Sequence, residues 1–211
     1  ISILKQNRCH TANTRTHKVY AMKNILCFGD SNTYGFDPET WGRYEYGQRW
    51  TGALQNILGD SCRIIEEGCC YRTTVFDDPT RPNSIGRPHL EMLLESHKPL
   101  DLVIICLGTN DLKRIFHVTA TESALGLGEL VKLVQRYDYG VHSAPRVLVL
   151  SPIVIREEIA SRQFFGFGFE AAAESRNFAS KFKEVADFYH CWFLDAANFA
   201  VPSRTDHLHM D

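Results

Sequence analysis

Asn24-Ile25-Leu26-Cys27-Phe28, followed by Gly29-Asp30-Ser31, opens the regular part of this sequence. The apolar run Asn24–Phe28 is typical of a buried parallel strand, which is covered on both faces of its sheet. Gly29 and Asp30 end the run, and Ser31 follows on the turn. Because ligands of open α/β sheets bind outside the carboxyl ends of the strands, Ser31 is well placed for chemistry.

Beyond this strand, short apolar runs alternate with helical patterns. Further strands are expected at Cys62–Glu66, Asp101–Leu107, Arg146–Leu150 and Cys191–Leu194. Helices are expected over residues 49–58, 84–97, 121–136 and 171–189, where apolar residues recur at helical spacing. This alternation predicts a parallel, three-layer α/β/α domain.

Composition places the chain among ordinary globular proteins. It has 211 residues, 44% of them hydrophobic and 23% charged, and a formal net charge of -2, which suggests one domain and argues against a general nucleic-acid binder. No apolar run approaches the ~20 residues that span a membrane. The seven scattered cysteines indicate reduced thiols rather than a disulfide framework, and we expect a cytoplasmic protein.

Residues 1–21 differ from the rest, because they contain basic and polar residues but no acidic one. They lack the apolar core of a secretory signal. We expect a disordered or foreign N-terminal extension, although the composition is also compatible with a transit peptide. The domain is then expected over residues 22–211, since Met22 directly precedes the first strand.

Four segments with reactive side chains each follow an expected strand. They are Ser31, the loop 68–74, Gly108-Thr109-Asn110-Asp111 and Asp206-His207-Leu208-His209. All four should therefore meet at one edge of the sheet.

A serine becomes a nucleophile beside a base that takes its proton. His209 is the candidate base, and Asp206, three residues earlier, is placed to orient its ring. Acyl transfer also needs hydrogen-bond donors for the oxyanion. The side chain of Asn110 and backbone N–H groups of Ser31 and the loop 68–71 are the candidates.

In their order, these four segments resemble the four conserved blocks of the GDSL/SGNH hydrolases. The flanking residues Arg49-Trp50-Thr51-Gly52, Arg72-Thr73-Thr74 and Asp77-Asp78-Pro79 are similar to the bacterial arylesterase/acyltransferase branch. The resemblance implies a flavodoxin-like fold with five parallel strands in the order 2-1-3-4-5, and a serine esterase that needs no cofactor and no metal. It also implies Ser31, His209 and Asp206 as catalytic residues.

The same resemblance implies an oxyanion hole formed by Ser31, Tyr71 and Asn110, with Gly68 as the turn glycine of the second block. The family usually has glycine where this chain has Tyr71, and often glycine where it has His207. The backbone N–H survives at Tyr71, but a tyrosine at positive φ would be strained. Relatives continue into a C-terminal helix, which we expect the domain 22–211 to lack.

Six residues are expected to line the substrate pocket: Asn32, Tyr34, Trp41, Cys70, Phe165 and Phe167. The alternative for the phenylalanines is packing in the core or between subunits. Asp206, His207, His209 and Asp211 together could instead hold a metal, because histidine and carboxylate are common ligands.

The function predicted from these observations is a serine esterase that hydrolyses, or transesterifies, small acyl esters through an acyl-enzyme on Ser31. The alternatives are a sugar O-deacetylase or lysophospholipase of the same superfamily, or a non-catalytic flavodoxin-like binding module. The expected partner is a small-molecule ester, and no binding to nucleic acid or to a membrane is expected. The sequence leaves open whether the chain forms a homo-oligomer.

Overall fold

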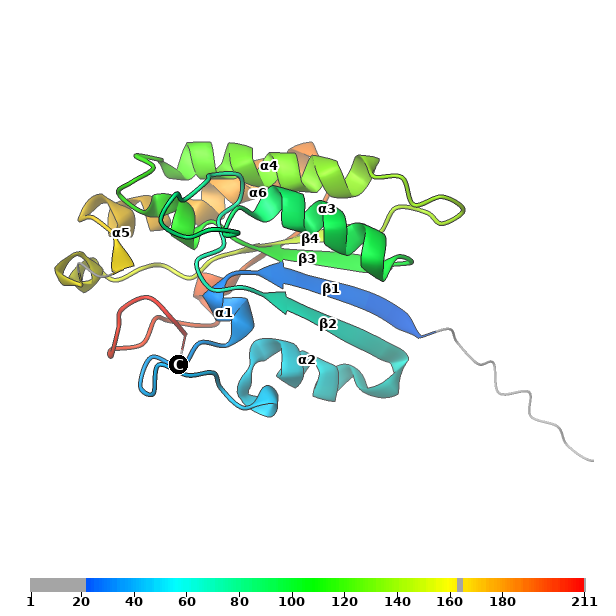
Figure 1. The fold of residues 1–211 in the computed structure, drawn as a ribbon, viewed down its shortest axis with the longest axis horizontal. Helices are drawn as coiled ribbons and strands as arrows, with labels where there is room; N and C mark the ends of the chain where they lie inside the picture. Colours follow the sequence, from blue (N-terminus) through cyan, green and yellow to red (C-terminus); the bar gives the residue numbers. More distant parts are fainter. Residues whose placement is uncertain (1–21, 163–164, 211) are drawn as a thin grey trace, which may run out of the picture.

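The computed structural model describes residues 22–162 and 165–210, so the N-terminal segment 1–21 lies outside the described residues. It contains a five-stranded parallel sheet in the order β2-β1-β3-β4-β5, flanked by helices (Figure 1). The predicted fold class and strand order are confirmed. The strands are β1 Lys23–Gly29, β2 Cys62–Gly68, β3 Leu102–Cys106, β4 Arg146–Ser151 and β5 Trp192–Asp195.

The three strands in one half of the sheet end level with one another. Gly29, the last residue of β1, pairs with Gly68 of β2 and with Cys106 of β3. The segments that follow these strands therefore begin at the same edge. This register brings Ser31, the loop after β2 and the loop after β3 close together.

Helices α3 (Gly86–His97), α4 (Ala120–Arg136) and α6 (Phe178–Phe188) cover one face of the sheet (Figure 1). The main core lies between them and the strands, and its fully buried side chains include Leu26, Phe28, Ile105, Leu127, Leu130 and Phe182. Full burial of each such side chain stabilises the fold by about 1.5–3 kcal/mol relative to leaving it exposed to water. This core gives the reactive edge a rigid support.

The other face is covered by α2 (Trp50–Leu58), and its core is smaller (Figure 1). Here Ile25, Cys27 and Ile104 are buried. At the β5 end, Trp192 is 51% and Leu194 is 41% exposed. No helix among the described residues has both the length and the apolar character needed to cross a membrane.

The expected helix over 171–189 is divided into α5 (Glu170–Ser175) and α6. At the break, Asn177 N–H bonds to Glu174 O, three residues back, instead of continuing the α-helical pattern. Ser175 Oγ accepts a hydrogen bond from Ile155 N–H. This bond ties the break to the segment after β4.

Candidate active site

Ser31 is the first residue of the short helix α1 (Ser31–Tyr34), which follows β1 directly. Asp30 caps this helix, because its side chain accepts the N–H of Asn32 at 3.0 Å. A Cβ on Gly29 would lie 2.9 Å from Cys106 O and still closer to Thr33. Glycine therefore lets β1 turn sharply against β3 and present Ser31 at the sheet edge.

The segment that contains His209 is fastened to α1 and to the loop after β4. Met210 N–H donates to Asn32 Oδ1 at 2.9 Å. Arg156 N–H donates to His207 O at 3.1 Å. Ser203 N–H donates to His209 O at 2.7 Å, which closes the segment on itself. These bonds place a distant part of the sequence beside Ser31.

A continuous chain of hydrogen bonds joins Ser31, His209 and Asp206, and all three residues are buried. His209 Nε2 lies 2.8 Å from Ser31 Oγ, and His209 Nδ1 lies 2.5 Å from Asp206 Oδ2. Asp206 Oδ1 accepts the backbone N–H groups of Leu208 and His209, each at 3.0 Å. Both carboxylate oxygens of Asp206 therefore have partners, and the ring of His209 is held toward Ser31.

The loop after β2 approaches α1 closely at Gly68, where a Cβ would lie 2.0 Å from Tyr34 N. Tyr71 has a φ of 68°, the left-handed conformation that the sequence suggested. The Arg72 side chain runs beneath the loop, donating to Gly29 O at 2.9 Å and to Glu67 O. Close packing and these bonds hold the start of this loop against β1 and α1.

The loop after β3 places Asn110 at the same edge. Asn110 Nδ2 donates to Arg72 O at 3.1 Å, which leaves its second N–H for another acceptor. Asp111 accepts hydrogen bonds from Thr74 N, Thr74 Oγ1 and Ser123 Oγ, at 2.9, 2.7 and 2.6 Å. Asp111 therefore fastens the loop after β3 to the loop after β2.

Two backbone donors near Ser31 are unused. Among the described residues, the N–H groups of Ser31 and Tyr71 donate to no other protein group. Buried backbone N–H groups are normally paired. Together with the second N–H of Asn110, they could donate to an oxygen atom bound beside Ser31.

Burial dominates the electrostatics around this edge. It raises the pKa of Asp30 to about 6 and that of Asp111 to about 6, even though hydrogen bonds to both carboxylates act in the other direction. Burial also acts to raise the pKa of Asp206, but the hydrogen bonds and charge of His209 outweigh it, so this pKa lies below its usual value. Asp206 is therefore the carboxylate that stays ionised beside the imidazole.

Ser31 faces a cavity of about 80 Å³ with largely aromatic walls. Of the six expected pocket residues, Trp41, Cys70, Phe165 and Phe167 line it. Asn32 and Tyr34 are not among its lining residues. Asn32 turns away to bind Met210 N–H, and the ring of Tyr34 lies 4.2 Å from the guanidinium carbon of Arg43.

Three further residues line this cavity that were not expected from the sequence: Phe36, Lys113 and Leu208. The ring of Phe36 contacts that of His209, with their centroids 4.4 Å apart. The only sequence feature that could have indicated Leu208 is its place directly before His209. Nothing in the local sequence pattern indicated Lys113, because its position depends on a long-range ion pair with Asp78.

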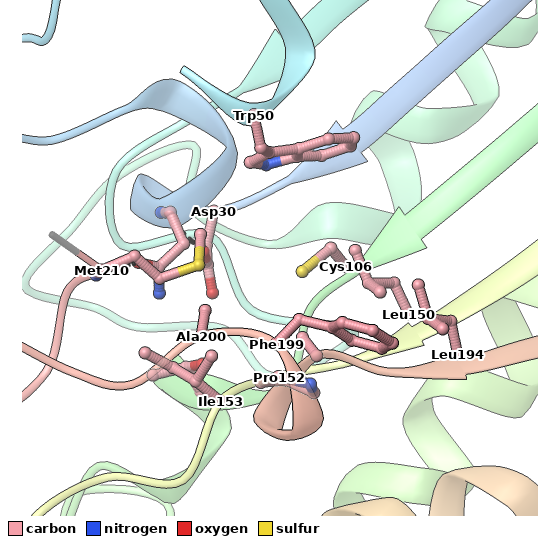
Figure 2. A pocket seen from close by; sticks show the side chains of 13 residues that line it. Asp30, Trp50, Cys106, Leu150, Pro152, Ile153, Leu194, Phe199, Ala200 and Met210 are labelled. Atoms are coloured by element: carbon pink, nitrogen blue, oxygen red, sulfur yellow. Dashed lines mark hydrogen bonds between the residues drawn. The ribbon is translucent and has the colours of Figure 1, made fainter. Parts of the chain in front are cut away.

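A second cavity, of about 230 Å³, contains neither Ser31 nor His209 (Figure 2). Trp50 lies on one side of it and Leu150, Pro152 and Phe199 on the other, with Asp30 and Met210 toward one end (Figure 2). Its lining is almost entirely apolar. It adjoins the thinly covered face of the sheet and has no nucleophile paired with a base.

Within residues 22–162 and 165–210, no group of three or more histidine, cysteine or acidic side chains is arranged to hold a metal. Asp206 is hydrogen-bonded to His209, and His209 in turn to Ser31. Asp211, the remaining carboxylate of the alternative metal site, lies outside the described residues.

Comparison with known proteins agrees with this geometry. Residues 27–211 match the model of the GDSL-like Lipase/Acylhydrolase family. The chain belongs to this family. It is therefore a carboxylic ester hydrolase, as its sequence predicts.

Several solved structures of esterases are similar to this GDSL hydrolase. Est24, a carbohydrate acetylesterase from Sinorhizobium meliloti, is 41% identical with a TM-score of 0.81, over 90% of this chain and 91% of that one. An aryl esterase from M. smegmatis is 38% identical with the same TM-score and coverage. A putative arylesterase from Agrobacterium tumefaciens is 33% identical with a TM-score of 0.83, again over 90% and 91%. A search of curated proteins found no match.

Proposed function

We propose that this hydrolase cleaves esters of small acyl groups through an acyl-enzyme on Ser31. The observation that carries the proposal is the hydrogen-bonded chain from Ser31 Oγ to His209 and on to Asp206. Ser31 Oγ attacks the ester carbonyl while His209 Nε2 takes the hydroxyl proton. Asp206 stabilises the imidazolium that forms and keeps its ring in place.

The rest of the cycle follows from proton balance. Collapse of the tetrahedral intermediate breaks the ester C–O bond, and His209 returns its proton to the departing alkoxide. Water then attacks the acyl-enzyme while His209 takes one of its protons, and Ser31 leaves with that proton as the free hydroxyl. An alcohol in place of water gives a new ester, so transesterification uses the same steps.

The negative oxygen of each intermediate needs donors that are already in position. The unused N–H groups of Ser31 and Tyr71 support this role. So does the second N–H of Asn110, whose amide is oriented by its bond to Arg72 O. Removing one such donor typically lowers kcat by about 10²–10³-fold.

The small size of the cavity beside Ser31, about 80 Å³, favours short acyl groups. Its aromatic walls and the similarity to aryl esterases favour an aromatic alcohol as the leaving group. Deacetylation of a sugar is the second candidate, because Est24 is described as a carbohydrate acetylesterase. Trp41 lines this cavity and is 61% exposed overall, so its ring is available to pack against either kind of alcohol.

The proposal is tested by labelling with a serine-directed fluorophosphonate. Wild type and Ser61→Ala, a control at an exposed serine in a surface turn, should label, whereas Ser31→Ala should not. p-Nitrophenyl esters of increasing acyl length should be hydrolysed with falling kcat/KM. An acetylated sugar that reacts faster than p-nitrophenyl acetate would favour the second candidate. Labelling that persists in Ser31→Ala would overturn the assignment of the nucleophile.

A further inference from the structure

Tyr71 occupies a backbone conformation that a tyrosine does not favour by itself. Its φ is 68°, in the left-handed region where a Cβ crowds the backbone. In this conformation Tyr71 lines the cavity beside Ser31, and its backbone N–H donates to no other described protein group. Something outside the local backbone must therefore stabilise it.

Two cations contact the ring of Tyr71. The guanidinium carbon of Arg81 lies 4.2 Å from the ring centroid, and Lys113 Nζ lies 4.8 Å from it. Both distances are within the ~6 Å over which a cation is attracted to an aromatic ring. The Lys113 side chain is buried, so water screens its charge less than at an exposed site.

Asp78 pairs with the Lys113 side chain and, through its backbone, fixes the turn from which Arg81 projects. Its Oδ2 lies 3.2 Å from Lys113 Nζ, and both side chains are buried. Its backbone oxygen accepts the N–H of Arg81 at 2.9 Å. Asp78 Oδ1 is in turn held by the N–H and the hydroxyl of Thr80, at 2.9 and 2.6 Å. The Lys113 ammonium that faces the Tyr71 ring is therefore held by an ion pair, and the backbone at Arg81 is held by a turn.

The same cluster joins the two loops that contain the oxyanion donors. Arg81 and Tyr71 belong to the segment after β2, whereas Lys113 follows Asn110 in the segment after β3, and its N–H donates to Asn110 O at 3.3 Å. A shift of Lys113 would therefore move the Tyr71 ring relative to Asn110.

We propose that Lys113 and Arg81 are positioning residues, which hold Tyr71 in the left-handed conformation so that its N–H points at the oxyanion. This inference rests on the proposed function, since it concerns the same site. Lys113 lines the cavity, but its ammonium already contacts Asp78 and the Tyr71 ring. We therefore assign the cluster to the backbone of the enzyme and not to a charged group of the substrate.

A double-mutant cycle tests the proposal, because glycine adopts positive φ without help. In the Tyr71 background, Arg81→Gln and Lys113→Met should each lower kcat for p-nitrophenyl acetate by about three- to tenfold, with KM nearly unchanged. In the Tyr71→Gly background the same two changes should alter kcat less than about twofold. Arg81→Lys and Lys113→Arg, which keep a cation, should retain most of the activity.

Lys113→Met leaves Asp78 buried without its partner and can unfold the protein. Arg81→Gln then carries the test, because only part of that residue is buried. Equal losses of kcat in both backgrounds, or unchanged kcat for Arg81→Gln in the Tyr71 background, would overturn the proposal. A rise in KM confined to esters with an anionic group would also overturn it, since that would assign the cations to substrate binding. Full activity in Ser31→Ala would refute the proposed function instead, whatever the cycle gives.

Discussion

The substitution Asp206→Asn tests whether Asp206 orients the ring of His209, because it changes the contact with that ring and leaves the surrounding backbone hydrogen bonds in place. Asp206 Oδ1 accepts two backbone N–H groups at 3.0 Å, from Leu208 and His209. An asparagine must keep its carbonyl oxygen at that place, because a flipped amide would leave two N–H groups without an acceptor at about 1–3 kcal/mol each. Its NH₂ group then faces His209 Nδ1 and donates to it.

This orientation forces the wrong tautomer of His209. Nδ1 becomes the acceptor, so the ring proton is on Nε2, which lies 2.8 Å from Ser31 Oγ and can no longer take the hydroxyl proton. By analogy with the same change in serine proteases, kcat should fall about 10³–10⁴-fold, equivalent to about 4–5.5 kcal/mol in the barrier. Stability should hardly change, because both backbone bonds are kept.

The assay is kcat for p-nitrophenyl acetate, with the thermal unfolding midpoint measured in parallel. Asp195→Asn is the matched control, because Asp195 also accepts a backbone N–H two residues ahead but does not line the Ser31 cavity. The control should keep wild-type kcat. If Asp206→Asn keeps more than about a tenth of the wild-type kcat while folded, Asp206 does not orient the base.

Three further predictions concern other parts of the site. His209→Ala should abolish hydrolysis of p-nitrophenyl esters while His207→Ala leaves most of it, whereas equal losses, or inhibition by chelators, would revive the metal site. Tyr71→Gly should change the preference for acyl length more than it lowers turnover of acetate esters, and a large drop for every ester would contradict this. Burial raises the pKa of Asp111 from 3.8 to about 6, so its contribution to stability is fully present below 3.8 and is lost as the pH rises through 6. Urea unfolding should therefore show that wild type loses stability relative to Asp111→Asn between these values, by on the order of 3 kcal/mol, and a difference that rises with pH would contradict the reasoning.

Much of the site could be predicted because its residues follow strands. The apolar run before Ser31 and the run before Asn110 both indicate buried strands, and parallel strands bring their carboxyl ends to one edge. Asp206 and His209 could be paired because they are three residues apart. The strained conformation of Tyr71 was also expected, since glycine is usual there in the family.

Other features depend on contacts between distant segments, which no local pattern encodes. Asn32 and Tyr34 adjoin the nucleophile in sequence, yet the packing of α1 turns both away from the cavity. The helix expected over 171–189 is interrupted where Ser175 binds Ile155 N–H, an interaction across the fold.

The local pattern of apolar, glycine and polar residues was enough to establish the sheet, its reactive edge and the candidate nucleophile, base and orienting carboxylate. Which side chains surround Ser31 was decided by the tertiary structure. Lys113 meets the Tyr71 ring where it pairs with a buried carboxylate, Asp78, and Arg81 reaches the same ring from a turn that bonds to the backbone of Asp78. The physical reason is that strand and helix periodicity are local properties, whereas ion pairs and ring contacts form between segments that only the packed core brings together.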